Sequence, residues 1–168
     1  MLEKLASILG ISSQFLLAGA AIRSTLEKDK GPQAMDGRVS VRLTIKMSAE
    51  ASWITSDAVA SSGTVEFHSN YGPAYAIRVT GDALHPRVRS GEFIIVEPGA
   101  ALEIGDEVLV SLHNGTSMIR ELLWRRDGQT ALMGVVDGSR LTLQDSEILE
   151  MMPIGAIIKP SRFSPPRT

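Results

Sequence analysis

Residues 81 to 96 read Gly81-Asp82-Ala83-Leu84-His85-Pro86-Arg87-Val88-Arg89-Ser90-Gly91-Glu92-Phe93-Ile94-Ile95-Val96. Gly81 suits a tight turn because glycine reaches backbone angles that other residues avoid, and Pro86 fixes φ beside it. Gly91 then lets the chain turn back into the apolar run from Phe93 to Val96. The segment therefore predicts a turn that leads into a strand.

Short strands separated by turn residues are expected on both sides of this segment. Asn114-Gly115 and Asp127-Gly128 are strong signals for two-residue hairpins. Because no helical pattern lies between the strands, we predict a mainly β fold, a mostly antiparallel coiled sheet or open barrel. From residue 64 onward the predicted strands are Thr64 to His68, Ala74 to Thr80, Phe93 to Val96, Glu107 to Leu112, Ser117 to Trp124, Thr130 to Val136 and Ile154 to Lys159.

The first third of the chain has a different character. Residues 2 to 9 predict a helix, and a second short helix is expected to end near Gly19. Residues 20–37 are interpreted as a linker because charged residues, Gly31 and Pro32 interrupt any period. Residues 39–47 alternate between apolar and polar side chains, which predicts a half-buried strand, and residues 48–63 are assigned to loop. Residues 161–168 are expected to be a flexible tail.

Composition bounds the class of protein. The chain has 168 residues and a net charge of −2, so binding to nucleic acid would depend on a local patch of charge. It has no cysteine, which excludes disulfides, thiolate catalysis and thiolate metal sites. The N-terminal apolar stretches are too short to span a bilayer or to act as a secretion signal. We expect a soluble cytoplasmic protein.

The segment from Gly81 to Pro86, followed by Gly91-Glu92 and an apolar strand, resembles the nucleophile segment of the LexA/CI-repressor family of self-cleaving Ser–Lys peptidases. That family has Gly-Asp-Ser-Met-x-Pro here, so Ala83 stands at the position of the serine. A methyl group can neither attack a carbonyl nor be activated by a base. The resemblance implies a LexA-peptidase-like domain over residues 38–160 with degenerate chemistry.

The position of the lysine base is identified by the same resemblance. In the family the lysine follows a Gly-Asp-x-Val-x-Val strand and a hairpin, in a Val-Lys-Arg-Leu context. Here Gly105-Asp106-Glu107-Val108-Leu109-Val110 and Asn114-Gly115 are followed by Ile119-Arg120-Glu121-Leu122. Arg120 therefore occupies the expected position, and a guanidinium does not deprotonate in proteins. Because both positions differ, natural divergence is favoured over an engineered serine-to-alanine change.

Two further stretches carry the resemblance. Gly155-Ala156-Ile157-Ile158-Lys159-Pro160 is similar to the closing strand of the family. Residues 1–19 resemble the last two helices of a Cro/CI-type helix-turn-helix domain, in the pattern Leu2-Glu3-Lys4-Leu5-Ala6 … Leu9-Gly10-Ile11-Ser12 … Leu16-Leu17-x-Gly19. In that domain the helix that reads the major groove comes earlier. The chain is thus expected to be part of a longer repressor or a truncated one.

The other candidate residues have simpler structural interpretations than a catalytic site. His68, His85 and His113 show no metal-ligand spacing, so no metal and no cofactor is expected. Asp82 and Asp106 are interpreted as turn carboxylates. A basic patch with Trp124 and Arg120 nearby is a candidate for contact with DNA or an acidic partner, although edge strands also carry such charges to block aggregation. Its members are Arg87, Arg89, Arg125 and Arg126.

Three functions follow from these observations. The first is the self-association module of a prophage CI-like transcriptional repressor, without self-cleavage, forming a homodimer or higher homo-oligomer. Such a module would act on operator DNA through a helix-turn-helix mostly outside this chain, and an antirepressor protein could bind it. The second is a peptidase that uses Ser90 or Ser117 with another base. The third is a stand-alone interaction protein.

Overall fold

A computed structural model describes residues 37–47, 54–57 and 63–166 of the chain. The predicted helix-turn-helix remnant at 1–19 and nearly all of the linker predicted at 20–37 lie outside these residues. The remainder is mainly β, as predicted. The strands are β1 (Arg38–Met47), β2 (Ile54–Asp57), β3 (Thr64–Glu66), β4 (Tyr75–Thr80), β5 (Phe93–Val96), β6 (Glu107–Leu112), β7 (Ser117–Arg126), β8 (Gln129–Gly134), β9 (Arg140–Gln144), β10 (Ile148–Ile158) and β11 (Phe163–Ser164).

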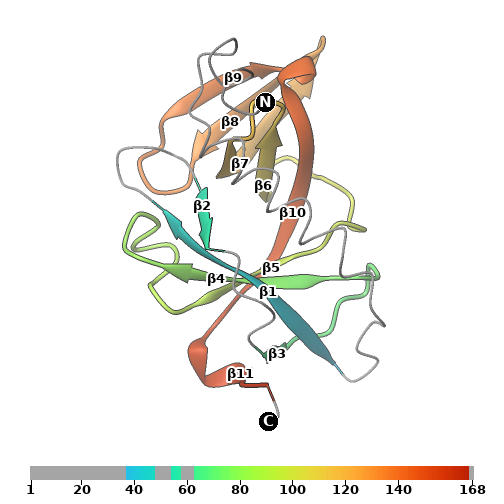
Figure 1. Cartoon of the computed structure of the whole chain (residues 1–168). Coiled ribbons are helices and arrows are strands. Elements are labelled where there is room, and N and C mark those ends of the chain that lie inside the picture. The colour runs from blue at the N-terminus through green and yellow to red at the C-terminus, as the bar shows by residue number, and fades with distance from the viewer. Residues whose placement is uncertain (1–36, 48–53, 58–62, 167–168) are drawn as a thin grey trace, which may run out of the picture.

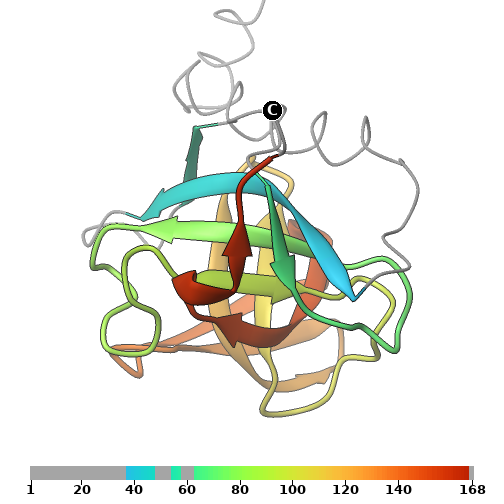
Figure 2. The same ribbon diagram turned by 90° about the horizontal axis from the view of Figure 1, so that it is seen from below.

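These strands form one open, curled sheet in the order β11-β3-β1-β4-β5-β10-β6-β7-β8-β9, with β2 paired to β1 outside this path. Most neighbours are antiparallel, as expected, but β1 and β4 run parallel. Figure 1 shows β6 to β9 in the upper half of the molecule and β1, β3, β4 and β5 in the lower half. Figure 2 shows β1 and β4 side by side, with the end of the chain passing beside β3.

Strand β10 connects the two halves, because one of its ends pairs in the upper half and the other pairs in the lower half. Ile148 to Pro153 pair with β6, and Ile154 to Ile158 pair with β5. The register shifts between Ile154 and Ala156, around Gly155. A Cβ on Gly155 would lie 1.8 Å from Oε2 of the buried Glu97, so a side chain at this junction would have to displace Glu97.

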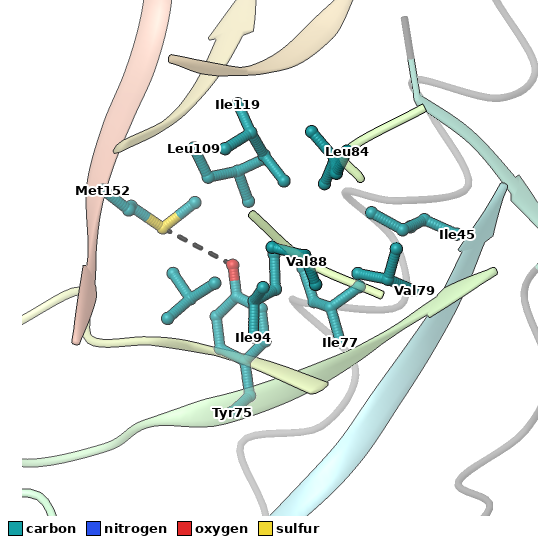
Figure 3. Close-up of a cluster of buried hydrophobic side chains, with 11 residues drawn as sticks. Ile45, Tyr75, Ile77, Val79, Leu84, Val88, Ile94, Leu109, Ile119 and Met152 are labelled. Carbon is teal, nitrogen blue, oxygen red and sulfur yellow. Dashed lines mark hydrogen bonds between the residues drawn. The ribbon is translucent and has the colours of Figure 1, made fainter. Parts of the chain in front are cut away.

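Alternation of apolar residues along the strands produces three clusters of buried side chains. One lies between β4, β5, β10 and the residue 81–92 turn, and Figure 3 shows its members. A second lies within the curl of β6 to β9, and a third between β1, β3 and β5. In the first cluster the Tyr75 hydroxyl donates to Met152 Sδ at 3.6 Å, and burial raises the pKa of Tyr75 above its ordinary value.

The structure differs from the sequence-based expectation in several local features. The loop assigned to 48–63 contains β2, which pairs with β1. Strand β9 and the first half of β10 were not predicted. The expectation of a flexible tail from residue 161 is wrong for its first part, because Pro160–Arg162 form a 3-10 turn and β11 pairs with β3. The ring of Phe163 stacks on the buried Phe93 at 5.3 Å between ring centroids, which gives this end of the chain a packing role.

Candidate functional site

The turn that carries Ala83 is an excursion of the chain between β4 and β5. Hydrogen bonds at its base join Val79 N–H to Glu92 O at 2.9 Å and Gly91 N–H to Val79 O at 2.8 Å. Inside the turn, Val88 N–H donates to Leu84 O at 2.9 Å. Gly81 has a φ of 82°, a conformation that a side chain would strain. The chain thus turns at this segment, with Gly81 in the left-handed conformation that favours glycine.

Two apolar side chains anchor this turn in the core. Leu84 and Val88 are 3% and 2% exposed, and both belong to the cluster of Figure 3. Ala83, at the position where the resemblance places the serine, is partly buried and packs against the same cluster. Its methyl group contributes to packing and offers no polar atom for chemistry.

The acid of the Gly91-Glu92 pair has a structural role. Glu92 is buried, its Oε2 accepts a hydrogen bond from Arg89 N–H at 2.9 Å, and its Oε1 accepts one from Lys159 Nζ. Burial by itself would raise the pKa of Glu92, but these hydrogen bonds and the positive charge of Lys159 lower it overall. Glu92 thus ties the turn to the segment after β10, a contact that the sequence did not predict.

Arg120 lies on β7, opposite Val108 of β6 and Gly134 of β8. It is 8% exposed, and its Nη1 donates to Ser139 Oγ at 2.9 Å. The Ser139 hydroxyl donates in turn to Asp137 Oδ1 at 2.9 Å. A Cβ on Gly134 would lie 1.9 Å from Asp137 Oδ1 and 2.8 Å from Arg120 Nη1, so the absence of a side chain there makes room for this network.

The network shifts the titration of its carboxylate. The backbone N–H and the hydroxyl of Ser139 both donate to Asp137, and together with the Arg120 charge they lower the pKa of Asp137. Sequence reasoning predicted a turn at Asp137-Gly138 but no contact with Arg120. The one signal for this contact in the sequence was the polar turn that follows β8, the hairpin partner of β7.

Neighbouring residues on β7 project from opposite faces of the sheet. Successive side chains on a strand alternate between its faces, so Ile119 and Arg120 point in opposite directions. Ile119 joins Leu84 and Leu109 in the cluster that packs beneath the Ala83 turn. Arg120 shares its face with Met118 and Leu122 of the cluster inside β6 to β9. The side chain of β7 that packs with the turn is therefore Ile119. The Arg120 guanidinium lies on the other face and binds Ser139, so it does not stand beside Ala83 as the base of a dyad would.

The predicted basic patch includes arginines that are already engaged with other groups. Arg87 makes a two-pronged contact with Glu107, through Nε to Oε1 and through Nη2 to Oε2 at 3.1 Å. Arg125 pairs with Asp145 at 3.1 Å. Arg126 lies over the ring of Trp124, with Cζ 4.8 Å from its centroid. Arg89 is exposed beside the buried Glu92. Carboxylates thus offset two of the four positive charges.

The serines considered as alternative nucleophiles make hydrogen bonds with neutral groups. Ser90 Oγ accepts a hydrogen bond from Gly81 N–H at 3.1 Å. Ser117 is buried, and its Oγ lies 3.1 Å from Ser111 Oγ. Neither contact supplies a general base.

The other residues considered in the sequence give no sign of catalysis or metal binding among the described residues. Asp106 Oδ2 accepts a hydrogen bond from Glu103 N–H at 2.8 Å, as a turn carboxylate does. Within the described ranges, no group of three or more His, Asp or Glu residues could hold a metal ion. In the same part of the chain, no helix has the length and apolar character needed to cross a bilayer.

Comparison with known families gives one match. Residues 35–134 match the model of the family described as Peptidase S24-like. The chain belongs to the Peptidase S24-like family. The match spans β1 to β8 and therefore contains both the Ala83 turn and Arg120. This supports the LexA/CI-type fold that the sequence predicted. No curated protein matches the chain.

Proposed function

We propose that this chain is the self-association module of a prophage CI-like transcriptional repressor and that it does not cleave itself. Membership of the Peptidase S24-like family supports a role of the LexA/CI kind. The observation that carries the proposal is the combination of an intact turn with an apolar group at its reactive position. Leu84 and Val88 hold the turn in the core, while Ala83 contributes only a methyl group.

The second position of the dyad supports the same conclusion. The mechanism of this family needs a neutral amine near Ser to accept its proton. A guanidinium such as that of Arg120 does not supply a neutral amine in proteins. Its Nη1 is also committed to Ser139, which is bonded to Asp137. A single reversion at residue 83 would therefore leave the site without a base.

Self-association gives such a domain a use that needs no chemistry. A two-fold pair of these domains would hold two helix-turn-helix heads on a palindromic operator, and the second head would bind at a high effective concentration. Release from DNA would then require another protein, and an antirepressor that binds this domain is the partner we propose. Such a repressor acts in the cytoplasm.

Two measurements on the unmodified chain test this proposal. Sedimentation equilibrium at micromolar concentration should give a dimer or a higher oligomer, and a strict monomer would contradict the self-association role. Incubation at alkaline pH followed by mass spectrometry should return the intact mass. Discrete fragments from pure protein would show that a different serine and base are active.

A further inference from the structure

β9 is an edge strand of the sheet, and the structure describes its side chains. β9 ends the strand order, and among the described residues its outer side has no partner strand. The other end of the order, β11, has only two residues. Natural proteins keep edge strands short or interrupt them, since an open edge pairs readily with another strand. β9 has five residues, Arg-Leu-Thr-Leu-Gln, without proline.

The register with β8 determines which backbone groups point outward. Asp145 N–H bonds to Gly128 O, and Gly134 N–H bonds to Ser139 O, both at 2.8 Å. In an antiparallel ladder the residues that exchange hydrogen bonds alternate with residues whose groups point away. Odd-numbered residues of β9 therefore bond to β8, and the backbone groups of Arg140, Thr142 and Gln144 point outward. Of these, Gln144 N–H is bound by Glu147 Oε2 at 2.7 Å.

We propose that the occupant of this edge is β9 of a second copy, paired antiparallel with Thr142 on the two-fold axis. Outward-facing residues then meet outward-facing residues: Thr142 meets Thr142, and Arg140 meets Gln144. Each Thr142 N–H donates to the opposite Thr142 carbonyl, and each Arg140 N–H donates to the opposite Gln144 carbonyl. The contact is isologous and closes after two copies.

Side chains support this register on both faces. Leu141 is partly buried against the cluster inside β6 to β9 and meets the buried Leu143 of the second copy. On the other face, Arg140, Thr142 and Gln144 are exposed. Arg140 stands at one end of β9, and the acidic 3-10 turn of Asp145 and Glu147 follows the other end. Antiparallel pairing brings the basic end of each strand beside the acidic end of its counterpart.

This inference rests on the proposed self-association and specifies its surface. The absence of cysteine from the chain makes it testable by disulfide trapping. Cα atoms of a hydrogen-bonded antiparallel pair lie about 5.5 Å apart, within the range that a disulfide spans. Under mild oxidation, Thr142→Cys should form a covalent dimer in high yield. Arg140→Cys alone should remain uncrosslinked, because residue 140 of the second copy lies about 14 Å along the strand from the residue that faces it. A mixture of Arg140→Cys and Gln144→Cys should crosslink, because these two positions face each other.

A second pair of variants tests the backbone contact. Thr142→Pro removes the outward N–H at the axis and is tolerated at an edge; it should raise the dimer dissociation constant roughly 10-fold to 100-fold. Thr142→Val keeps that N–H and should dimerise like the unmodified chain. Circular dichroism confirms folding of each variant. A stable dimer in which Thr142→Cys does not crosslink would overturn the β9 contact and leave self-association standing, whereas an unmodified monomer would overturn both.

Discussion

Ala83 and Arg120, to which the resemblance assigns the two positions of the dyad, lie on differently built parts of this molecule. The Ala83 turn is an apolar plug: Leu84 and Val88 enter the core, and Ala83 packs beside them. The Arg120 end of β7 is a polar network, in which a nearly buried guanidinium bonds to Ser139 and through it to Asp137. Packing in the core thus holds the Ala83 position, whereas hydrogen bonds hold the Arg120 position.

The largest effect is expected from breaking the apolar plug. Leu84→Ala removes most of a side chain that is 3% exposed and should lower the free energy of unfolding by about 2–5 kcal/mol, because it leaves a cavity. Arg89→Ala, an exposed change in the same turn, should alter it by no more than about 0.5 kcal/mol. Urea unfolding measures both. Equal losses would show that Leu84 does not anchor the turn.

A smaller effect is expected from breaking the polar network. Arg120→Ala removes the partner of Ser139 and the packing of the long side chain, and should cost about 1–3 kcal/mol of unfolding free energy. The matched control is Arg125→Ala on the same strand, whose side chain is 53% exposed in its pair with Asp145. That exposed pair should contribute at most about 1 kcal/mol. If the two variants lose the same stability in urea, the Arg120 network is no more than a surface contact.

The smallest effect is expected in the titration of Asp137. Ser139→Ala removes the hydroxyl bond to Asp137, so the pKa of Asp137 should rise toward its ordinary 3.8. A lowered folded-state pKa stabilises the protein above the unfolded pKa, and this stabilisation is lost as the pH falls through the folded value. The variant should therefore be less sensitive to acid near that pH. Carboxyl NMR titration measures the shift, and the pKa of Asp145, held low by Thr130 and Arg125, should not move.

Sequence predicted those parts of the fold whose signals are local. Alternating apolar residues predicted β1, and the Asn114-Gly115 and Asp127-Gly128 turns predicted the hairpins around β7. The first half of β10 was missed because Pro153 argues against a strand; in the structure its carbonyl accepts a hydrogen bond from Glu97 N–H. β9 was missed because Leu141 and Leu143 alternate over only five residues.

In the candidate site too, local features were predicted from the sequence and contacts between distant residues were not. Gly81, Pro86 and Gly91 predicted the Ala83 turn because turn chemistry is local. The contacts from Lys159 to Glu92 and from Arg120 to Ser139 join residues far apart in the chain, or across three strands. Spacing in a sequence does not encode which distant polar groups meet, since that depends on how the sheet curls. The parallel pairing of β1 with β4 was not predicted for the same reason.

If the serine and the lysine of the dyad are both absent, as we propose, restoring the serine alone should not restore cleavage. The most direct test is the intact mass of Ala83→Ser after prolonged incubation at alkaline pH, beside the unmodified chain. We expect one mass, that of the uncleaved variant. Paired fragments whose masses sum to the variant plus one water would contradict it, because they would require a base other than residue 120.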